Sequence, residues 1–220
     1  MDASASKTSG GTYGEMYLVD SAVAIVINAA DEWHALETLL EGIGQNFTYE
    51  LGSDGAIASV ADAGGGDITI TDVEHGLSAG DMITINGCSD AAYNGLFEVK
   101  TVPTADTYTV TAVYTATDTG TWQKGSNLTC VVAGDYTGRW SASGISETNA
   151  HIFDFAPAVN TTLSTKAKAR RKFSNADYGS FGGCGIMTFA VGDKISFNLQ
   201  NVGASGNVTI RTLDLNIHIL

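Results

Sequence analysis

The sequence predicts an all-β protein in which a small β-domain is inserted into a loop of a larger one. The chain of 220 residues contains 26 Gly but only 2 Pro, a composition typical of many short strands joined by glycine turns. Apolar and polar residues alternate in residues 187–191, 195–199 and 213–220, which is the period of a strand with one buried face. A hydrophobic fraction of 44% is ordinary for a chain that folds around a core.

The chain begins with twelve small and polar residues, 1–12. These residues cannot bury enough surface to offset the entropy of ordering, so we expect a flexible N-terminal arm. Strands are expected at residues 16–18, 23–27 and 47–51. The second of these is apolar throughout, which predicts burial of both its faces.

Residues 31–42 form the one helix candidate of the sequence. Trp33, Leu36 and Leu40 lie at helical spacing, and Gly42 stands where a helix could end. The segment is short and lies between expected strands.

Residues 53–125 are predicted to form the inserted acidic β-domain. From residue 56 to 123 nine acidic side chains accompany a single basic residue, Lys100. Strands at 67–71 and 82–85 are separated by a glycine-containing turn. Both ends of the segment look like turns, at 52–55 and 124–126, as a domain inserted into a loop requires. Residues 13–52 and 126–220 are then the larger domain.

Composition also excludes several classes of partner. The net charge of −13 argues against nucleic-acid binding, which needs a basic face, and against anionic membranes. No apolar run approaches the roughly 20 residues that span a bilayer, and the first residues lack a signal peptide. We therefore expect synthesis in a host cytoplasm and reduced, mostly packed thiols at Cys88, Cys130 and Cys184.

The motifs of the common enzyme classes are absent from the sequence, and we expect no catalytic activity and no cofactor. A glycan-cleaving site would need a pair of carboxylates, and no pair stands out.

His75 could be a metal ligand, but its Gly-Leu neighbours favour a turn residue that caps backbone groups, and no metal site is predicted. His218 should point away from Ile217 and Ile219. Cys184, between two glycines, is interpreted as a small packed residue.

Five of the eleven basic residues fall within seven positions and are called the basic stripe below: Lys166, Lys168, Arg170, Arg171 and Lys172. In a strand, alternate members of the stripe share one face. The stripe is interpreted either as a solvated or lysine-protected sheet edge or as a docking surface for an acidic partner. The two interpretations carry equal weight.

The outer pieces of the chain resemble the jelly roll shared by tumour necrosis factor and the globular heads of complement-type proteins, especially versions found in bacteriophage virions. The matching residues are 14–17, 134–143, 191–197 and 207–220. The middle segment resembles a small β-domain of phage fibre and decoration proteins through residues 75–81, 93–97 and 106–110. The resemblance implies an all-β jelly-roll sandwich with an inserted small β-barrel or sandwich.

Members of the jelly-roll family form trimers in which one sheet of each protomer faces the three-fold axis. The chain ends on apolar strand residues, where chain ends are usually polar and frayed, and we expect sister copies to cover them. The resemblance places six apolar side chains at this trimer interface: Phe197, Leu199, Leu213, Leu215, Ile217 and Ile219.

The predicted function is that of a trimeric capsid decoration (cement) protein on the virion surface, which stabilises the assembled shell by binding it. Lys7, Tyr13 and the basic stripe are the expected contacts with the major capsid protein. The alternative is the receptor-binding tip of a tail fibre or spike, with a host surface glycan or receptor bound through the insert.

Overall fold

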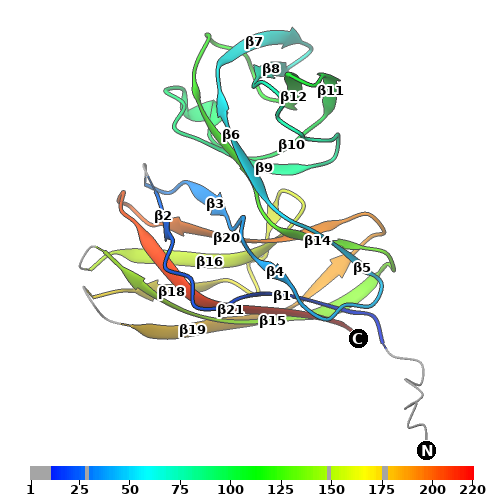
Figure 1. The fold of residues 1–220 in the computed structure, drawn as a ribbon, viewed down its shortest axis with the longest axis vertical. Coiled ribbons are helices and arrows are strands. Elements are labelled where there is room, and N and C mark those ends of the chain that lie inside the picture. The colour runs from blue at the N-terminus through cyan, green and yellow to red at the C-terminus, as the bar shows by residue number, and fades with distance from the viewer. Residues whose placement is uncertain (1–10, 28–29, 148–149, 175–177) are drawn as a thin grey trace, which may run out of the picture.

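The computed structural model describes residues 11–27, 30–147, 150–174 and 178–220. Within these residues the expected all-β sandwich fold with an inserted β-domain is confirmed, and the single helical element is a 3₁₀ turn, η1 (Ala91–Tyr93). Figure 1 shows two units, one above the other. The lower one, called the main unit, is formed by both ends of the chain, and the upper one, called the inserted unit, is formed by the middle of the chain.

The main unit is a sandwich of two antiparallel sheets (Figure 1). The first sheet has the order β19 (Gly179–Phe189), β15 (Gly134–Ser146), β21 (Val208–Ile219), β1 (Tyr13–Leu18) and β4 (Leu40–Glu41), with β2 (Ala24–Ile25) also paired to β21. The second has the order β17 (Thr162–Leu163), β16 (Ile152–Val159), β20 (Lys194–Asn201), β14 (Asn127–Cys130) and β5 (Phe47–Glu50), with β18 (Ala169–Lys172) beside β16 and β3 (Trp33–Ala35) beside β20.

The inserted unit consists of two further four-stranded sheets. Their orders are β10 (Gly95–Glu98), β9 (Met82–Asn86), β13 (Gly120–Lys124), β6 (Ser53–Ile57), and β11 (Thr101–Thr104), β12 (Thr107–Thr111), β8 (Asp67–Thr71), β7 (Ser59–Gly64). This unit has a core of its own, built around Trp122, Tyr108 and Tyr93. The core of the main unit is a separate cluster between its two sheets, which includes Trp140, Phe155 and Phe197.

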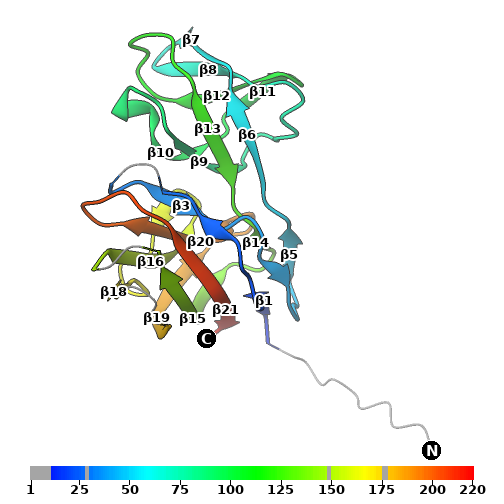
Figure 2. The ribbon, with the colours of Figure 1, turned by 60° about the vertical axis from the view of Figure 1, so that its left-hand side comes forward.

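The two units are joined by a two-stranded ribbon. Ser53 pairs with Lys124 at the foot of the inserted unit, and Glu50 pairs with Asn127 at the top of the main unit. The connections therefore lie side by side, and Figure 2 shows them running from one unit to the other. The residues expected to form a turn at 52–55 instead begin β6.

The helix expected at residues 31–42 is wrong. Trp33 and its neighbours pair with β20 as strand β3, and the amide of Leu36 continues the ladder by donating to the carbonyl of Phe197. Leu36 is buried in the core, whereas Leu40, on the same expected helical face, is 47% exposed. Pairing with β20 satisfies backbone groups that a short helix would have to satisfy alone.

The strand expected at 23–27 is also shorter and less buried than its sequence suggests. Only β2 is a strand, and Val23 and Val26 are exposed. Of the expected N-terminal arm, residues 1–10 lie outside the described residues. Thr12 is buried, and its carbonyl accepts a hydrogen bond from the amide of Ile219.

Candidate functional site

The basic stripe is bound to a buried acid of the same chain. Asp154, on β16, has no exposure to solvent and pairs across the sheet with Arg170. Arg170 donates from Nε to Oδ1 at 2.6 Å and from Nη2 to Oδ2 at 2.9 Å, and Lys168 Nζ lies 2.6 Å from Oδ2. Burial alone would raise the pKa of Asp154, but the hydrogen bonds from these cations and from Gln200 lower it to about 2.

The rest of the stripe has different surroundings. Lys166 and Lys172 are exposed and form no ion pair with the described residues. Arg171 donates to the carbonyl of Ser180 at 2.9 Å and lies over the ring of Phe173. Thus two cations of the stripe have an intramolecular role that the sequence did not indicate, and the remaining members lie at the surface near β19.

The other expected capsid contacts lie apart from the stripe. Tyr13 is on β1, and its ring stacks on His218 with ring centroids 6.0 Å apart. Lys7 lies outside the described residues. His218 is exposed while Ile217 is fully buried, as their alternation predicted.

The side chains expected at the trimer interface lie in or against the core of a single chain. Phe197, Leu199, Leu213, Leu215 and Ile217 are at most 2% exposed and belong to the core of a single chain, and Ile219 packs against that core. The strand β21 lies between β15 and β1, so both of its edges are paired, and its apolar side chains pack in the core, although Leu220 just beyond it is exposed. Alternation correctly indicated a buried face, but that face is buried against the second sheet rather than against a sister copy.

The opposite side of this sheet, called the outer face, is covered by no described part of the chain (Figure 1). It carries Arg139, Ser141, Asp214, Asn216 and other polar side chains, and a depression of about 160 Å³ lies among these four residues and Trp140. Burial raises the pKa of Asp214, and the nearby carboxylate of Glu15 raises it further.

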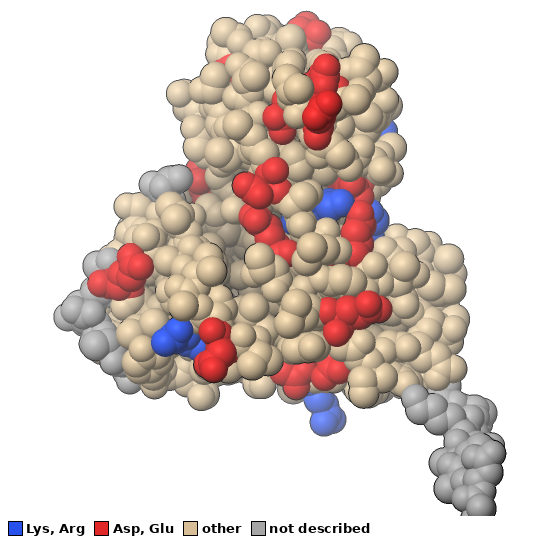
Figure 3. Space-filling view, viewed as in Figure 1, with Lys and Arg blue, Asp and Glu red and all other residues tan. Residues whose placement is uncertain are grey.

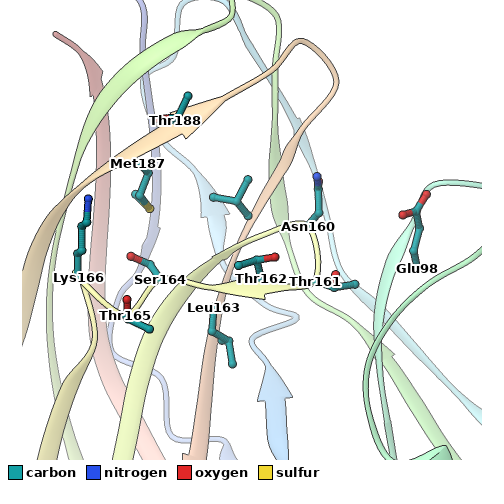
Figure 4. Close-up of a pocket in the computed structure, with 11 residues that line it drawn as sticks. Glu98, Asn160, Thr161, Thr162, Leu163, Ser164, Thr165, Lys166, Met187 and Thr188 are labelled. Atoms are coloured by element: carbon teal, nitrogen blue, oxygen red, sulfur yellow. The ribbon is translucent and has the colours of Figure 1, made fainter.

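A larger cleft of about 550 Å³ lies where the two units meet, and it is called the inter-unit cleft (Figure 4). Glu98 approaches it from the inserted unit, and Lys166 lies at the opposite end of the view. Hydroxyl groups dominate the rest of the lining, which consists of Val159, Asn160, Thr161, Thr162, Leu163, Ser164, Thr165, Met187 and Thr188. A second depression of about 330 Å³ shares Glu98 and Thr161 and adds Phe97.

Four charged groups that the sequence did not reveal link the two units in addition to the ribbon. Lys194 of the main unit lies 2.5 Å from Asp81 of the inserted unit, and Lys124 lies 2.7 Å from Glu50 and 3.5 Å from Asp81. Figure 3 shows acidic and basic side chains gathered at the waist between the units. Desolvation opposes the charge of Lys194, but Asp81 and Glu50 raise its pKa above the ordinary value.

The predicted role of His75 is confirmed, whereas that of Cys184 is wrong. His75 Nδ1 accepts a hydrogen bond from the amide of Leu77 at 3.0 Å, which is the expected backbone cap. Cys184 is exposed on β19, although Cys88 and Cys130 are buried. Among the residues that the structure describes, no group of three or more His, Cys, Asp or Glu side chains is arranged to hold a metal ion.

No family model matches the chain. No curated protein matches it either. One solved structure with a detectable likeness is the insecticidal delta-endotoxin Cry8Ea1 from Bacillus thuringiensis, with 8% identity, a TM-score of 0.26, and coverage of 94% of this chain and 53% of the toxin chain. The chain thus spans about half the length of that toxin. In the described part of the chain, no helix is long and apolar enough to cross a membrane.

Proposed function

We propose that the protein is a non-catalytic structural component of a bacteriophage particle, a trimeric decoration protein that binds and stabilises the capsid shell. The observation that carries the proposal is the outer face of the β19-β15-β21-β1-β4 sheet. It is a broad sheet surface, it lies on the side of the main unit away from the inserted unit, and no described segment packs on it (Figures 1 and 2).

The chemistry of this face suits contact with sister copies better than catalysis. Its side chains are small, polar or aromatic, such as Ser141, Asn216 and Tyr17, and the depression between β15 and β21 has a volume of only about 160 Å³. Self-association through this face replaces the interface expected from the apolar residues of β21. The inserted unit then projects away from the trimer, where its acidic surface stays in solvent.

Sedimentation equilibrium of the purified chain tests the trimer. Ser141→Arg places a long side chain in the depression on the outer face, and we expect it to convert the trimer to monomer. Ala63→Arg, on the exposed strand β7 of the inserted unit, is the matched control and should remain trimeric. A monomeric wild-type chain at all concentrations would refute self-association.

The decoration role is tested on particles. Shells assembled without this chain should lose integrity on heating or at low salt, and adding back the purified protein should restore it. Equal tolerance of particles with and without the protein would reject the role.

The second candidate is the receptor-binding tip of a tail fibre or spike, and the inter-unit cleft is the observation that favours it. Its hydroxyl and amide groups, the Glu98 carboxylate and the Phe97 ring nearby are the kinds of group that bind a saccharide of a host surface. The number of copies per particle separates the two candidates, because a decoration protein is present in hundreds of copies and a tip in few.

A further inference from the structure

Strand β19 is an unusually long and unprotected sheet edge. It ends the order β19-β15-β21-β1-β4 and extends over eleven residues, Gly179–Phe189. The other strands that end a sheet in the described residues have two to six residues. Proteins protect sheet edges with charges, proline or bulges, yet β19 contains no charged residue and no proline.

The hydrogen bonds of the neighbouring strand show which backbone groups face this edge. The amide of Leu220, just beyond β21, donates to the carbonyl of Asp135 on β15, so odd-numbered residues at this end of β15 bond toward β21. Even-numbered residues such as Gly138 therefore bond toward β19, where Gly138 lies opposite Gly185. The even-numbered residues of β19 must then direct their N–H and C=O groups away from the sheet.

An independent contact supports this assignment. The carbonyl of Ser180, an even-numbered residue, accepts a hydrogen bond from Arg171, which lies outside this sheet on β18. Beyond Ser180, the even-numbered residues Gly182, Cys184, Ile186 and Thr188 are all exposed, and no backbone partner in the described residues satisfies them. Ile186 is 51% exposed. The strand thus presents a row of unpaired donors and acceptors to solvent.

Cations flank this edge. Lys166 lies close to Gly185: if Gly185 had a Cβ atom, that atom would be 3.0 Å from the Cβ atom of Lys166. Arg171 marks the other end at Ser180. If a second copy of β19 paired with this edge across a two-fold axis, the basic stripes of the two copies would come together and repel each other. A different strand with carboxylates at alternate positions would instead place those carboxylates beside Lys166 and Arg171.

We propose that β19 binds an extended, acidic segment of a partner protein, which adds to the sheet as a further strand. Gly182, Cys184 and Ile186 would supply about six backbone hydrogen bonds, two from each residue. The side chains of the segment at alternate positions would lie beside Lys166 and Arg171, which select carboxylates. The proposal concerns this edge alone and goes beyond the proposed role of the outer face.

The probe is a fluorescein-labelled heptapeptide, Thr-Glu-Val-Glu-Val-Glu-Thr, and its binding is measured by fluorescence anisotropy at low and high salt. The same peptide with lysine in place of glutamate should bind at least about tenfold more weakly, a difference of 1.4 kcal/mol. A third peptide, N-methylated at alternate amides, should not bind, because it cannot donate to the edge. This comparison uses the unaltered protein.

Two substitutions locate the site on β19. Cys184→Pro removes an N–H group that points out from the edge and leaves the hydrogen bonds between β19 and β15 intact, so the strand can tolerate the proline. Peptide affinity should fall at least about tenfold. Cys184→Thr keeps the N–H and should bind as the wild type does. If Cys184→Pro loses its cooperative thermal unfolding, Ile186→Pro replaces it.

A charge reversal tests the selection of carboxylates. Lys166→Glu should weaken binding of the acidic peptide and strengthen that of the lysine peptide, whereas Lys100→Glu on the inserted unit makes the same change in net charge and should do neither. Equal binding by the proline and threonine variants, or equal binding of the acidic and basic peptides, overturns the proposal. If the wild type binds no peptide, and Cys184→Pro has a smaller oligomeric mass than the wild type in the absence of peptide, the edge pairs with a second copy of this chain and the proposal is overturned.

Discussion

Arg170 makes a two-point ion pair with Asp154, a carboxylate that is fully inaccessible to solvent. A buried charge is tolerated only when its partners compensate the loss of hydration. The pair therefore joins β18 to β16 and stabilises the edge of the second sheet. Together with the contact from Lys168, it accounts for two of the five cations of the basic stripe.

Removing this cation should destabilise the fold. Arg170→Leu is expected to lower the free energy of unfolding by about 2 to 3 kcal/mol, because Lys168 is then the one cation left beside Asp154 among the described residues, with the Gln200 amide as its other partner. Lys172→Leu is the matched control, since Lys172 lies on the same strand face and forms no ion pair with any residue that the structure describes. It should change stability by less than about 0.5 kcal/mol. Urea unfolding measures both, and equal effects would mean that the ion pair is not what stabilises this edge.

The same pair predicts how stability depends on pH. The pKa of Asp154 is about 2 in the folded chain, below its ordinary value of 3.8. The stabilisation from this group is therefore fully present above pH 4 and is lost as the pH falls from 4 to 2. It amounts to about 2 kcal/mol. Urea midpoints measured from pH 6 to pH 2 should fall more steeply for the wild type than for Asp154→Asn, and parallel curves would contradict this assignment.

Asp81 should hold the two units in one orientation. It is buried and lies near both Lys124 and Lys194. Within the described part of the chain, Asp81→Asn therefore leaves the buried Lys124 and the partly buried Lys194 with only Glu50 as an anionic partner, and should cost about 3 kcal/mol. Small-angle scattering should show a broader range of distances between the units. Asp67→Asn removes an exposed pair with Lys100 and is the control, with an expected cost below about 1 kcal/mol.

Asp214 on the outer face should have the opposite pH behaviour to Asp154. Its pKa is raised by burial and by Glu15, so the folded chain binds this proton more tightly than the unfolded chain does. Its charge opposes folding at neutral pH, and the penalty is relieved as the pH falls toward the raised pKa. Asp214→Asn should therefore be at least as stable as the wild type at pH 7. A loss of stability at pH 7 that disappears at pH 4 would show that the carboxylate is favourable instead.

The sequence was sufficient to predict the features that depend on local pattern. Alternation identified the buried face of β21, the exposed position of His218 and the shared face of Lys168, Arg170 and Lys172. Glycine and turn residues located the inserted unit. These features depend on neighbours along the chain, which are visible in the sequence.

The features that the sequence did not resolve depend on pairing between distant segments. Trp33 follows a helical pattern but pairs with β20, which is formed much later in the chain. Leu215 has the pattern of a half-buried strand, but the pattern does not say whether the second sheet or a sister copy covers it. Nothing in the sequence around Asp154 indicates that it binds Arg170, because that pairing depends on β16 and β18 being neighbours in the sheet.

The glycines of β19 lead to a last prediction about how the sandwich closes at this edge. Trp140 donates from its indole Nε1 to the carbonyl of Ala167 at 2.7 Å, which links β15 of the first sheet to the segment before β18 of the second. Gly183 lies against this bond, because a Cβ atom there would come within 2.5 Å of the Ala167 oxygen and 2.7 Å of the Trp140 nitrogen. Gly183→Ala must therefore separate the donor from the acceptor or displace β19, at an expected cost of about 2 kcal/mol. Cys184→Ala, one position along and exposed, should cost less than about 0.5 kcal/mol. Tryptophan fluorescence during urea unfolding measures both, and an unchanged midpoint in Gly183→Ala would show that the two sheets are not held together by this contact.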